Sequence, residues 1–240
     1  YTSLYGGEVV TQVGGPVGLF YGYKTQGVFS TSEDAAFAGL RDGRADGDVF
    51  RGGDMHFADL VADGVIDEKD KTVIGDPNPD IFGNFGTSLH YKNWTLNAFF
   101  SYSLGNDIYN YQRAVLEGGS TYYNQTTAVL NRWTSEGQVT EIPRAELGDP
   151  MGNSRFSDRW IEDGSYLKLK TLSLSYRIPF NYTFLQGITV WAAANNVFTC
   201  TKYLGSDPEL SISSSAVGQG IDRGLLGRGR SFVLGVKINL

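Results

Sequence analysis

The residues most able to do chemistry lie in one acidic stretch, residues 59–70, whose spacing matches a twelve-residue calcium-binding loop. The expected oxygen ligands are Asp59, Asp63, the main-chain carbonyl of Val65, Asp67 and Asp70. Gly64 stands at the sixth position, where such loops turn sharply. Calcium suits this pattern because it accepts about six to eight hard oxygen ligands in variable geometry. The sequence therefore predicts a Ca²⁺ site, and Ca²⁺ is the only cofactor expected.

Two positions depart from the calcium-loop pattern. Val61 occupies the third position, where a side-chain oxygen is expected, and Asp70 at the twelfth is shorter than the usual glutamate. A second interpretation therefore stays open, in which the stretch is an acidic turn held by Gly64 and by burial of Ile66. A bound ion would neutralise clustered carboxylates and stiffen a long loop, which is a structural role.

The acidic charge is concentrated in one part of the chain. Residues 31–80 hold 13 of the 26 acidic residues but only five basic ones, although the whole chain carries a net charge of only −6. A protein that follows nucleic-acid phosphates needs Lys and Arg gathered on one face. We therefore expect no nucleic-acid partner.

Catalytic groups are scarce in the sequence. His56 and His90 are the only histidines, and neither has a second histidine at metal-ligand spacing. Cys200 is the single cysteine and has no evident activating partner. Pairs of carboxylates such as Asp67 and Asp70 belong to the acidic loop rather than to a cleft that separates an acid from a base. The sequence therefore predicts no enzyme, and no catalytic residue is assigned.

Apolar and polar residues alternate with a period of two in five segments, which are 82–91, 94–105, 166–178, 188–198 and 231–240. This pattern predicts β-strands with one apolar face. The pair Lys92-Asn93 predicts a tight hairpin turn, and a shift of the apolar phase near Lys170-Thr171 predicts a β-bulge. A weaker sixth strand candidate covers residues 9–23, and residues 179–187 are expected to form a short turn.

The connections between these segments are alternately short and long. Long connections cover 24–81, 106–165 and 199–230, so an up-and-down arrangement places all of them at the same end of the sheet. Transmembrane β-barrels have this asymmetry, with short periplasmic turns and long extracellular loops. The sequence therefore predicts an all-β fold, an antiparallel transmembrane β-barrel segment of about six strands with one helix in 106–165, near residues 122–133. A soluble antiparallel sandwich is the alternative.

Several short strings, in order along all 240 residues, resemble the C-terminal part of SusC/RagA-type TonB-dependent outer-membrane transporters of Bacteroidetes. They are PVGLFYGY at 16–23, the acidic stretch 59–70, TVIGDPNPD at 72–80, GNDIYN at 105–110, DGSYLKLK at 163–170, NNVFT at 195–199, DPE at 207–209 and RSF at 230–232. Each string alone is weak, and their order carries the resemblance. In this family the third position of the acidic stretch commonly supplies a ligand that Val61 lacks here.

The resemblance implies that residues 1–240 are a C-terminal portion of a receptor β-barrel, with 24–81 as an acidic extracellular loop and 106–165 as a loop containing the helix. It implies import of a nutrient across the bacterial outer membrane, with an oligosaccharide preferred over a peptide. The implied partners are a SusD-like lipoprotein, outer-membrane lipid, and TonB through an N-terminal part outside these residues. The alternative function is a soluble or surface calcium-dependent glycan-binding β domain.

No substrate-binding residue is assigned from the sequence. Within 106–165, Tyr122, Tyr123, Trp133 and Trp160 are aromatic side chains that either stack on sugars or pack the loop onto itself.

Overall fold

The structure is a computed structural model that describes residues 1–44, 48–179, 187–213 and 215–239. The chain divides into two compact units, which we call the loop unit and the sheet unit. The loop unit consists of Tyr1–Asn78, Asp107–Glu162 and Leu210–Leu225. The sheet unit consists of Pro79–Asn106, Asp163–Glu209 and Leu226–Leu240.

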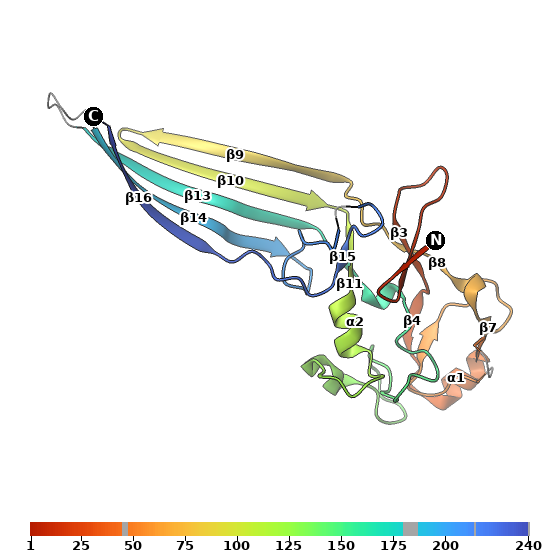
Figure 1. Ribbon diagram of the computed structural model, residues 1–240. Helices are drawn as coiled ribbons and strands as arrows, with labels where there is room; N and C mark the ends of the chain where they lie inside the picture. Colours follow the sequence, from red (N-terminus) through yellow and green to blue (C-terminus); the bar gives the residue numbers. More distant parts are fainter. Residues whose placement is uncertain (45–47, 180–186, 214, 240) are drawn as a thin grey trace. The chain divides into compact units, whose positions relative to one another are not determined.

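The sheet unit is one antiparallel sheet of five long strands in the order β16-β14-β13-β10-β9 (Figure 1). The strands are β9 (Ile81–Tyr91), β10 (Trp94–Leu104), β13 (Tyr166–Ile178), β14 (Gly187–Thr201) and β16 (Ser231–Asn239). Each corresponds to one of the five segments predicted from alternation. The predicted hairpin turn is confirmed, because Tyr91 pairs with Trp94 across Lys92 and Asn93.

The sixth strand candidate, residues 9–23, does not join this sheet. It contributes instead to two short strands of the loop unit, β2 (Gly7–Val10) and β3 (Leu19–Gly22), which pair with each other. The backbone N–H of Gly15 donates to the carbonyl of Gln12 between them. The sheet therefore has five strands rather than six. Most of the predicted turn at 179–187, residues 180–186, lies outside the described residues, as does Leu240.

The loop unit is built from several small sheets. One has four strands in the order β1-β2-β3-β8, with β1 at Thr2–Leu4 and β8 at Thr72–Gly75. A second has the order β12-β11-β15, from Ile161–Asp163, Asp107–Asn110 and Ile221–Asp222. Two further pairs join β4 (Thr25–Val28) to β6 (Met55–Phe57) and β5 (Arg41–Asp42) to β7 (Val65–Ile66).

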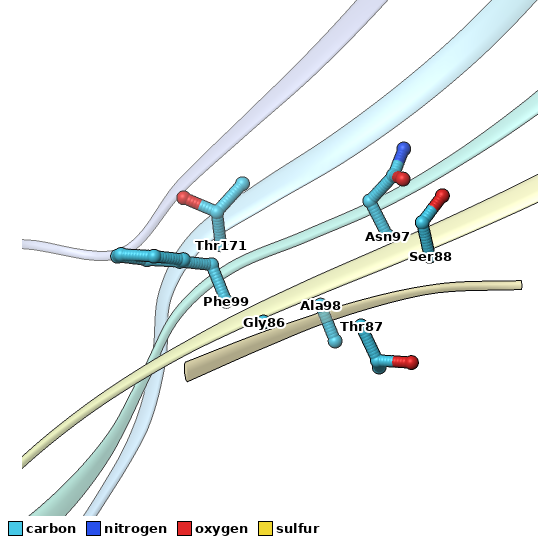
Figure 2. A pocket seen from close by; sticks show the side chains of 7 residues that line it. All are labelled: Gly86, Thr87, Ser88, Asn97, Ala98, Phe99 and Thr171. Atoms are coloured by element: carbon cyan, nitrogen blue, oxygen red, sulfur yellow. The ribbon is translucent and has the colours of Figure 1, made fainter. Parts of the chain in front are cut away.

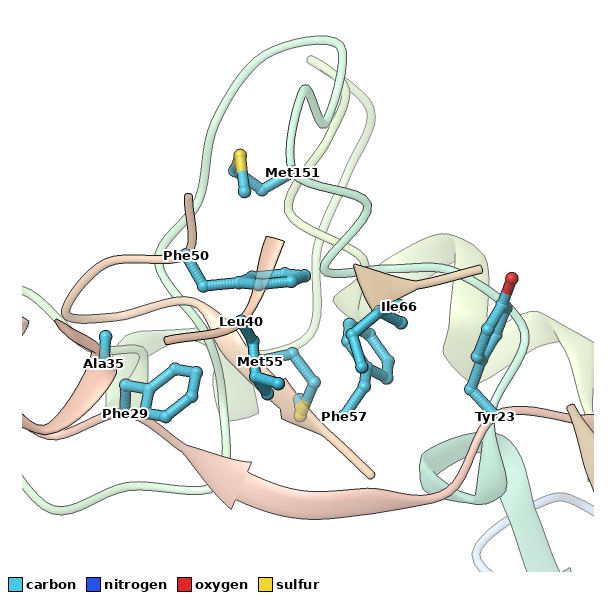
Figure 3. Close-up of a cluster of buried hydrophobic side chains, with 9 residues drawn as sticks. All are labelled: Tyr23, Phe29, Ala35, Leu40, Phe50, Met55, Phe57, Ile66 and Met151. Atoms are coloured by element: carbon cyan, nitrogen blue, oxygen red, sulfur yellow. The ribbon is translucent and has the colours of Figure 1, made fainter. Parts of the chain in front are cut away.

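Two clusters of buried side chains hold the loop unit together. The first, shown in Figure 3, consists of Tyr23, Phe29, Ala35, Leu40, Phe50, Met55, Phe57, Ile66 and Met151. The second consists of Val9, Phe20, Tyr109, Trp160 and Ile221. Each cluster joins residues that are far apart in the sequence. Burial of apolar surface, at roughly 25 cal/mol per Å², therefore stabilises segments that sequence analysis treated as separate connections.

The helices of the loop unit are short. Helix α1 (Ser32–Ala38) begins where Thr31 accepts a hydrogen bond from the backbone N–H of Asp34, and it ends at Gly39, whose φ is +67°. Helix α2 (Tyr111–Glu117) begins after Asn110, whose side chain accepts from the N–H of Arg113. The predicted helix near 122–133 is wrong in position, because α2 precedes it and only the 3₁₀ turn η2 (Thr127–Asn131) lies there.

Among the helices of the described residues, none has both the length and the apolar character needed to cross a membrane.

Candidate functional site

The five-stranded sheet has one continuous apolar face. The register places Leu89, Leu96, Leu174, Ala192 and Leu234 in one row across all five strands. The row beside it consists of Tyr91, Trp94, Tyr176, Val190 and Val236. Many of these side chains are exposed, and Leu234 keeps 84% of its surface accessible. An apolar face of this extent is typical of contact with lipid or a large partner surface.

The opposite face of the sheet is mainly polar. One row across it consists of Ser88, Asn97, Ser173, Ala193 and Val233, and the next of His90, Thr95, Ser175, Trp191 and Gly235. His90 lies here between the hydroxyls of Ser88 and Thr95, at 3.1 and 3.0 Å. These two hydroxyls give the His90 ring polar partners on this face of the sheet. The alternation across the sheet is what the wall of a transmembrane barrel requires.

The predicted bulge in β13 is confirmed. Leu169 pairs with Phe100 and Thr171 pairs with Phe99, so Lys170 has no partner residue on β10. The register towards β14 also shifts between Leu169 and Thr171. The bulge keeps Leu172, Leu174 and Tyr176 on the same apolar face as Leu167 and Leu169.

Four charged side chains meet on the polar face, and we call Lys168, Lys170, Asp207 and Glu209 the lysine cluster. The Lys168 ammonium lies 2.8 Å from carboxylate oxygens of both Asp207 and Glu209, and that of Lys170 lies 2.6 Å from Glu209. The side chain of Lys168 is only 3% exposed.

Glu209 also accepts hydrogen bonds from the hydroxyls of Tyr166 and Ser101. Burial alone would raise the pKa of Glu209, but hydrogen bonds and charge from the two lysines outweigh it and hold this pKa below its ordinary value. The cluster therefore keeps Glu209 ionised.

The lysine cluster was not predicted from the sequence. Its signal was two lysines inside a strand that is otherwise rich in leucine, since a buried lysine requires a partner. The partners lie about 40 residues further along the chain, as the hydrogen bond from Lys168 to Asp207 spans 39 residues. Nothing in the local pattern of either segment indicates the pairing.

The predicted calcium ligands occupy one turn, where their carboxylates cap backbone N–H groups. Asp59 accepts from Ala62 and Gly64, at 2.6 and 2.8 Å. Asp63 accepts from the N–H of Val65 at 3.0 Å. Ile66 follows in β7 and is fully buried in the first cluster of the loop unit. The burial of Ile66 is the feature that the acidic-turn interpretation predicted.

The last two predicted ligands close the turn on itself. Asp70 is 1% exposed and accepts from the N–H groups of Leu60 and Asp67, at 2.8 and 2.9 Å. Asp67 accepts from the N–H of Lys69, and the Lys69 ammonium lies 3.3 Å from Asp67 and 3.5 Å from Asp63. The N–H and the charge of Lys69 lower the pKa of Asp67. These oxygens are thus shared with backbone donors and one ammonium.

A convergent ion cage is not formed by these side chains. Within residues 1–44, 48–179, 187–213 and 215–239, no three His, Cys, Asp or Glu side chains are grouped so that they could hold a metal ion. The second lone pairs of Asp59 and Asp63 fit a hard cation, whereas the buried Asp70 is committed to the backbone. An ion bound between Asp63 and Asp67 would have to displace the Lys69 ammonium from these carboxylates. The calcium site stays a prediction.

Of the aromatic residues considered for sugar stacking, two are used in packing. Trp160 is 1% exposed, and the indole N–H of Trp133 donates to the carbonyl of Ser30. Tyr122 and Tyr123 remain 88% and 72% exposed.

The two remaining candidates for chemistry have no catalytic partner in the described contacts. His56 stacks on Phe29 with ring centroids 4.3 Å apart, and burial lowers its pKa. Cys200 is free and exposed, and it pairs with Leu167 in the sheet register.

A shallow hollow of about 310 Å³ lies on the sheet beside Phe99. Figure 2 shows that Phe99, Thr171, Asn97 and Ser88 point to one side of the sheet, whereas Ala98 and Thr87 point to the other. The Phe99 ring also covers Gly86, where an added Cβ would lie 3.4 Å from a ring carbon. Because its lining side chains point to both faces, the hollow is a feature of the strand surface rather than an enclosed ligand site.

Comparisons with known proteins identify relatives for nearly the whole chain. No family model matches. The chain is 34% identical over 239 residues to TonB-dependent receptor P3 of Formosa agariphila, a match covering 95% of this chain and 23% of that protein. It is 28% identical over 189 residues to TonB-dependent receptor SusC of Bacteroides thetaiotaomicron, covering 76% of this chain and 17% of SusC.

Solved structures show the same fold. Two structures of the RagAB peptide importer, in its open-open and closed-closed states, match with TM-scores of 0.70 and 0.72 at 22% and 24% identity. They cover 97% and 99% of this chain and 23% and 24% of the matched chains. The chain thus spans between about a sixth and a quarter of the length of the proteins it matches.

Proposed function

Because the chain belongs to the TonB-dependent receptors of the SusC/RagA type, we propose that it forms part of an outer-membrane importer driven through TonB. Its five strands would supply a section of the barrel wall, and its loop unit would lie on the extracellular side. The wall separates lipid from an aqueous interior, and the chain contributes to transport without bond-making chemistry. No residue of it is assigned a catalytic role.

One observation carries this proposal, which is the exposed apolar face opposite a polar face on the same strands. Phe232 and Leu234 on β16 are 81% and 84% exposed. At roughly 25 cal/mol per Å², leaving a face of this size in water is costly, whereas lipid removes the cost. A soluble glycan-binding sandwich, the alternative, would have to cover this face with a second sheet.

For the cargo, we propose an oligosaccharide delivered by a SusD-like lipoprotein. Tyr122 and Tyr123 support this proposal, because exposed rings on an outer loop offer flat apolar surfaces to sugar rings. The structures named as a peptide importer make a peptide the competing cargo class. Growth assays separate the two classes.

The membrane proposal is tested on the full-length gene product. We expect it to fractionate with the outer membrane, to partition into the detergent phase, and to migrate faster on gels before heating than after. A product that stays in the aqueous phase without heat-modifiable migration would refute the barrel.

The transport proposal is tested by deleting the gene. We expect loss of growth on the imported oligosaccharide, with growth on its free monosaccharides unchanged. We also expect a tagged receptor to co-purify with a lipoprotein encoded beside it. Loss of growth on oligopeptides alone would keep transport and reject the sugar, whereas unchanged growth on both classes would reject import.

A further inference from the structure

In the described part of the sheet unit, the lysine cluster contains three ion pairs. Lys168 is almost fully buried, and such a cation is stable only when it is paired and hydrogen-bonded. Its partners, Asp207 and Glu209, come from the connection that leaves β14, not from a strand. The cluster therefore fixes a piece of loop against the polar face of the sheet.

The fixed piece is residues 203–209, which we call the strap. The strap makes further contacts, since the N–H of Glu209 donates to Asp207 and the N–H of Gly227 donates to the hydroxyl of Ser206. Tyr203 and Asp207 are 6% and 5% exposed. The strap follows the end of β14, and Gly227 lies shortly before β16, so the hydrogen bond between Gly227 and Ser206 joins the two ends of this long connection within the sheet unit.

The position of the strap in the chain gives it a role. Glu209 is the last residue of the sheet-unit segment Asp163–Glu209, and Leu210 is the first residue of the loop-unit segment Leu210–Leu225. That segment carries β15, which pairs in parallel with β11. The ion pairs of Asp207 and Glu209 therefore come directly before the point in the sequence where the sheet unit ends and a loop-unit segment begins.

We propose that the lysine cluster is a latch that anchors the strap to the polar face of the sheet and so fixes where the last long loop leaves the wall. Lys168 is the buried anchor, and Lys170 is a second, more accessible clamp on Glu209. Neither lysine is a ligand-binding residue in this proposal. The latch goes beyond the transport proposal, because it concerns the folded position of a loop and not the cargo.

Hydrogen exchange in the full-length receptor tests the latch. Glu209→Gln keeps the shape of the side chain but removes its charge, which leaves Lys170 unpaired and Lys168 with Asp207 alone. We expect exchange of the amides of residues 203–207 and 209 to rise at least about tenfold, with protection of β9 and β10 unchanged. The matched control is Glu141→Gln, because Glu141 is exposed and has no ion pair or hydrogen bond among the described contacts.

A second variant keeps the test decisive if Glu209→Gln fails to fold. Lys170→Met removes the accessible clamp and leaves Lys168 with both carboxylates, so we expect a smaller rise in strap exchange with the sheet intact. Strap exchange within twofold of wild type in a folded Glu209→Gln protein would overturn the latch. If only Lys170→Met folds, exchange equal to that of the Glu141→Gln control would overturn it. Transport can fail or succeed independently of either result.

Discussion

The two faces of β16 provide a direct test of which side meets lipid. Leu234 lies on the apolar face and Val233, its neighbour, lies on the polar face, where Lys237 is already present. Arginine at each position adds the same charge and nearly the same volume. We therefore compare Leu234→Arg with Val233→Arg in the full-length receptor, and expect only the first to be strongly destabilising.

The size of the effect follows from the position of Leu234 along the strand. β16 has nine residues, and Leu234 is next to Gly235, the central one. At about 3.4 Å per residue, Leu234 lies about 3 Å along the strand from its middle, well inside an apolar band about 25 Å tall. Arginine near the bilayer midplane costs about 2–4 kcal/mol in such barrels, which is roughly a 30- to 900-fold change in the folding equilibrium.

A third position controls for depth. Ile238 shares the apolar face but lies three residues from the centre of β16, about 10 Å along the strand. With a strand tilt of about 40°, this places it nearer the interface, where the cost falls to about 0–1 kcal/mol. We expect the order of destabilisation to be Leu234→Arg, then Ile238→Arg, with Val233→Arg also below about 1 kcal/mol.

The assay is urea unfolding in phospholipid vesicles, followed by the fraction of receptor that migrates as a folded barrel on unheated gels. A lower midpoint for Leu234→Arg alone supports the assignment of faces. Equal shifts for Leu234→Arg and Val233→Arg would refute it, because the difference between them depends only on which side faces lipid. No shift for Leu234→Arg would refute contact of this face with the membrane.

Three further predictions concern the loop unit. Asp54 is fully buried and accepts hydrogen bonds from Arg144 at 2.8 Å and Asn153 at 3.0 Å. Asp54→Ala should therefore destabilise the loop unit by about 3 kcal/mol, seen as faster hydrogen exchange around β6 with exchange in the sheet unit unchanged. Exchange around β6 equal to that of the wild type would contradict this. If Ca²⁺ binds residues 59–70, it displaces the Lys69 ammonium from Asp67, so Lys69→Ala should enlarge the rise in Tm at millimolar Ca²⁺. The site would be rejected if Ca²⁺ raised the Tm of neither the wild type nor Lys69→Ala more than Mg²⁺ does. Burial lowers the pKa of His56 in the folded state below its unfolded value of about 6.5, so its contribution to the stability of the loop unit is full above that pH and falls as the pH drops below it. His56→Gln should remove this loss, measured by hydrogen exchange corrected for intrinsic rates. A dependence of stability on pH that is the same in His56→Gln and the wild type would contradict this.

The strands of the sheet were predictable because their signal is local and repeated. Each contains at least nine residues, so the alternation recurs several times in one segment. The hairpin at Lys92 and Asn93 then sets the register of β9 against β10 without any information from distant residues.

The loop unit was not predictable in the same way. Its strands have two to four residues, too few for alternation to separate them from a turn. Helix α2 was misplaced because the spacing of apolar residues at 122–133 favoured a helix, whereas the cap at Asn110 sets the start eleven residues earlier, at Tyr111. Clusters that join Tyr23 to Met151 depend on tertiary contacts and leave no periodic mark.

The bulge in β13 links the wall to the latch. Leu167, Leu169, Leu172 and Leu174 lie on the apolar face, and their spacing would be regular if residue 170 were absent. The alternation of the apolar face therefore does not require Lys170, and the extra residue interrupts the ladder to β10. What Lys170 adds is a second ammonium group 2.6 Å from Glu209. If the latch is the reason for this irregularity, Lys170→Met should loosen the strap while the pairing of β13 with β10 stays intact.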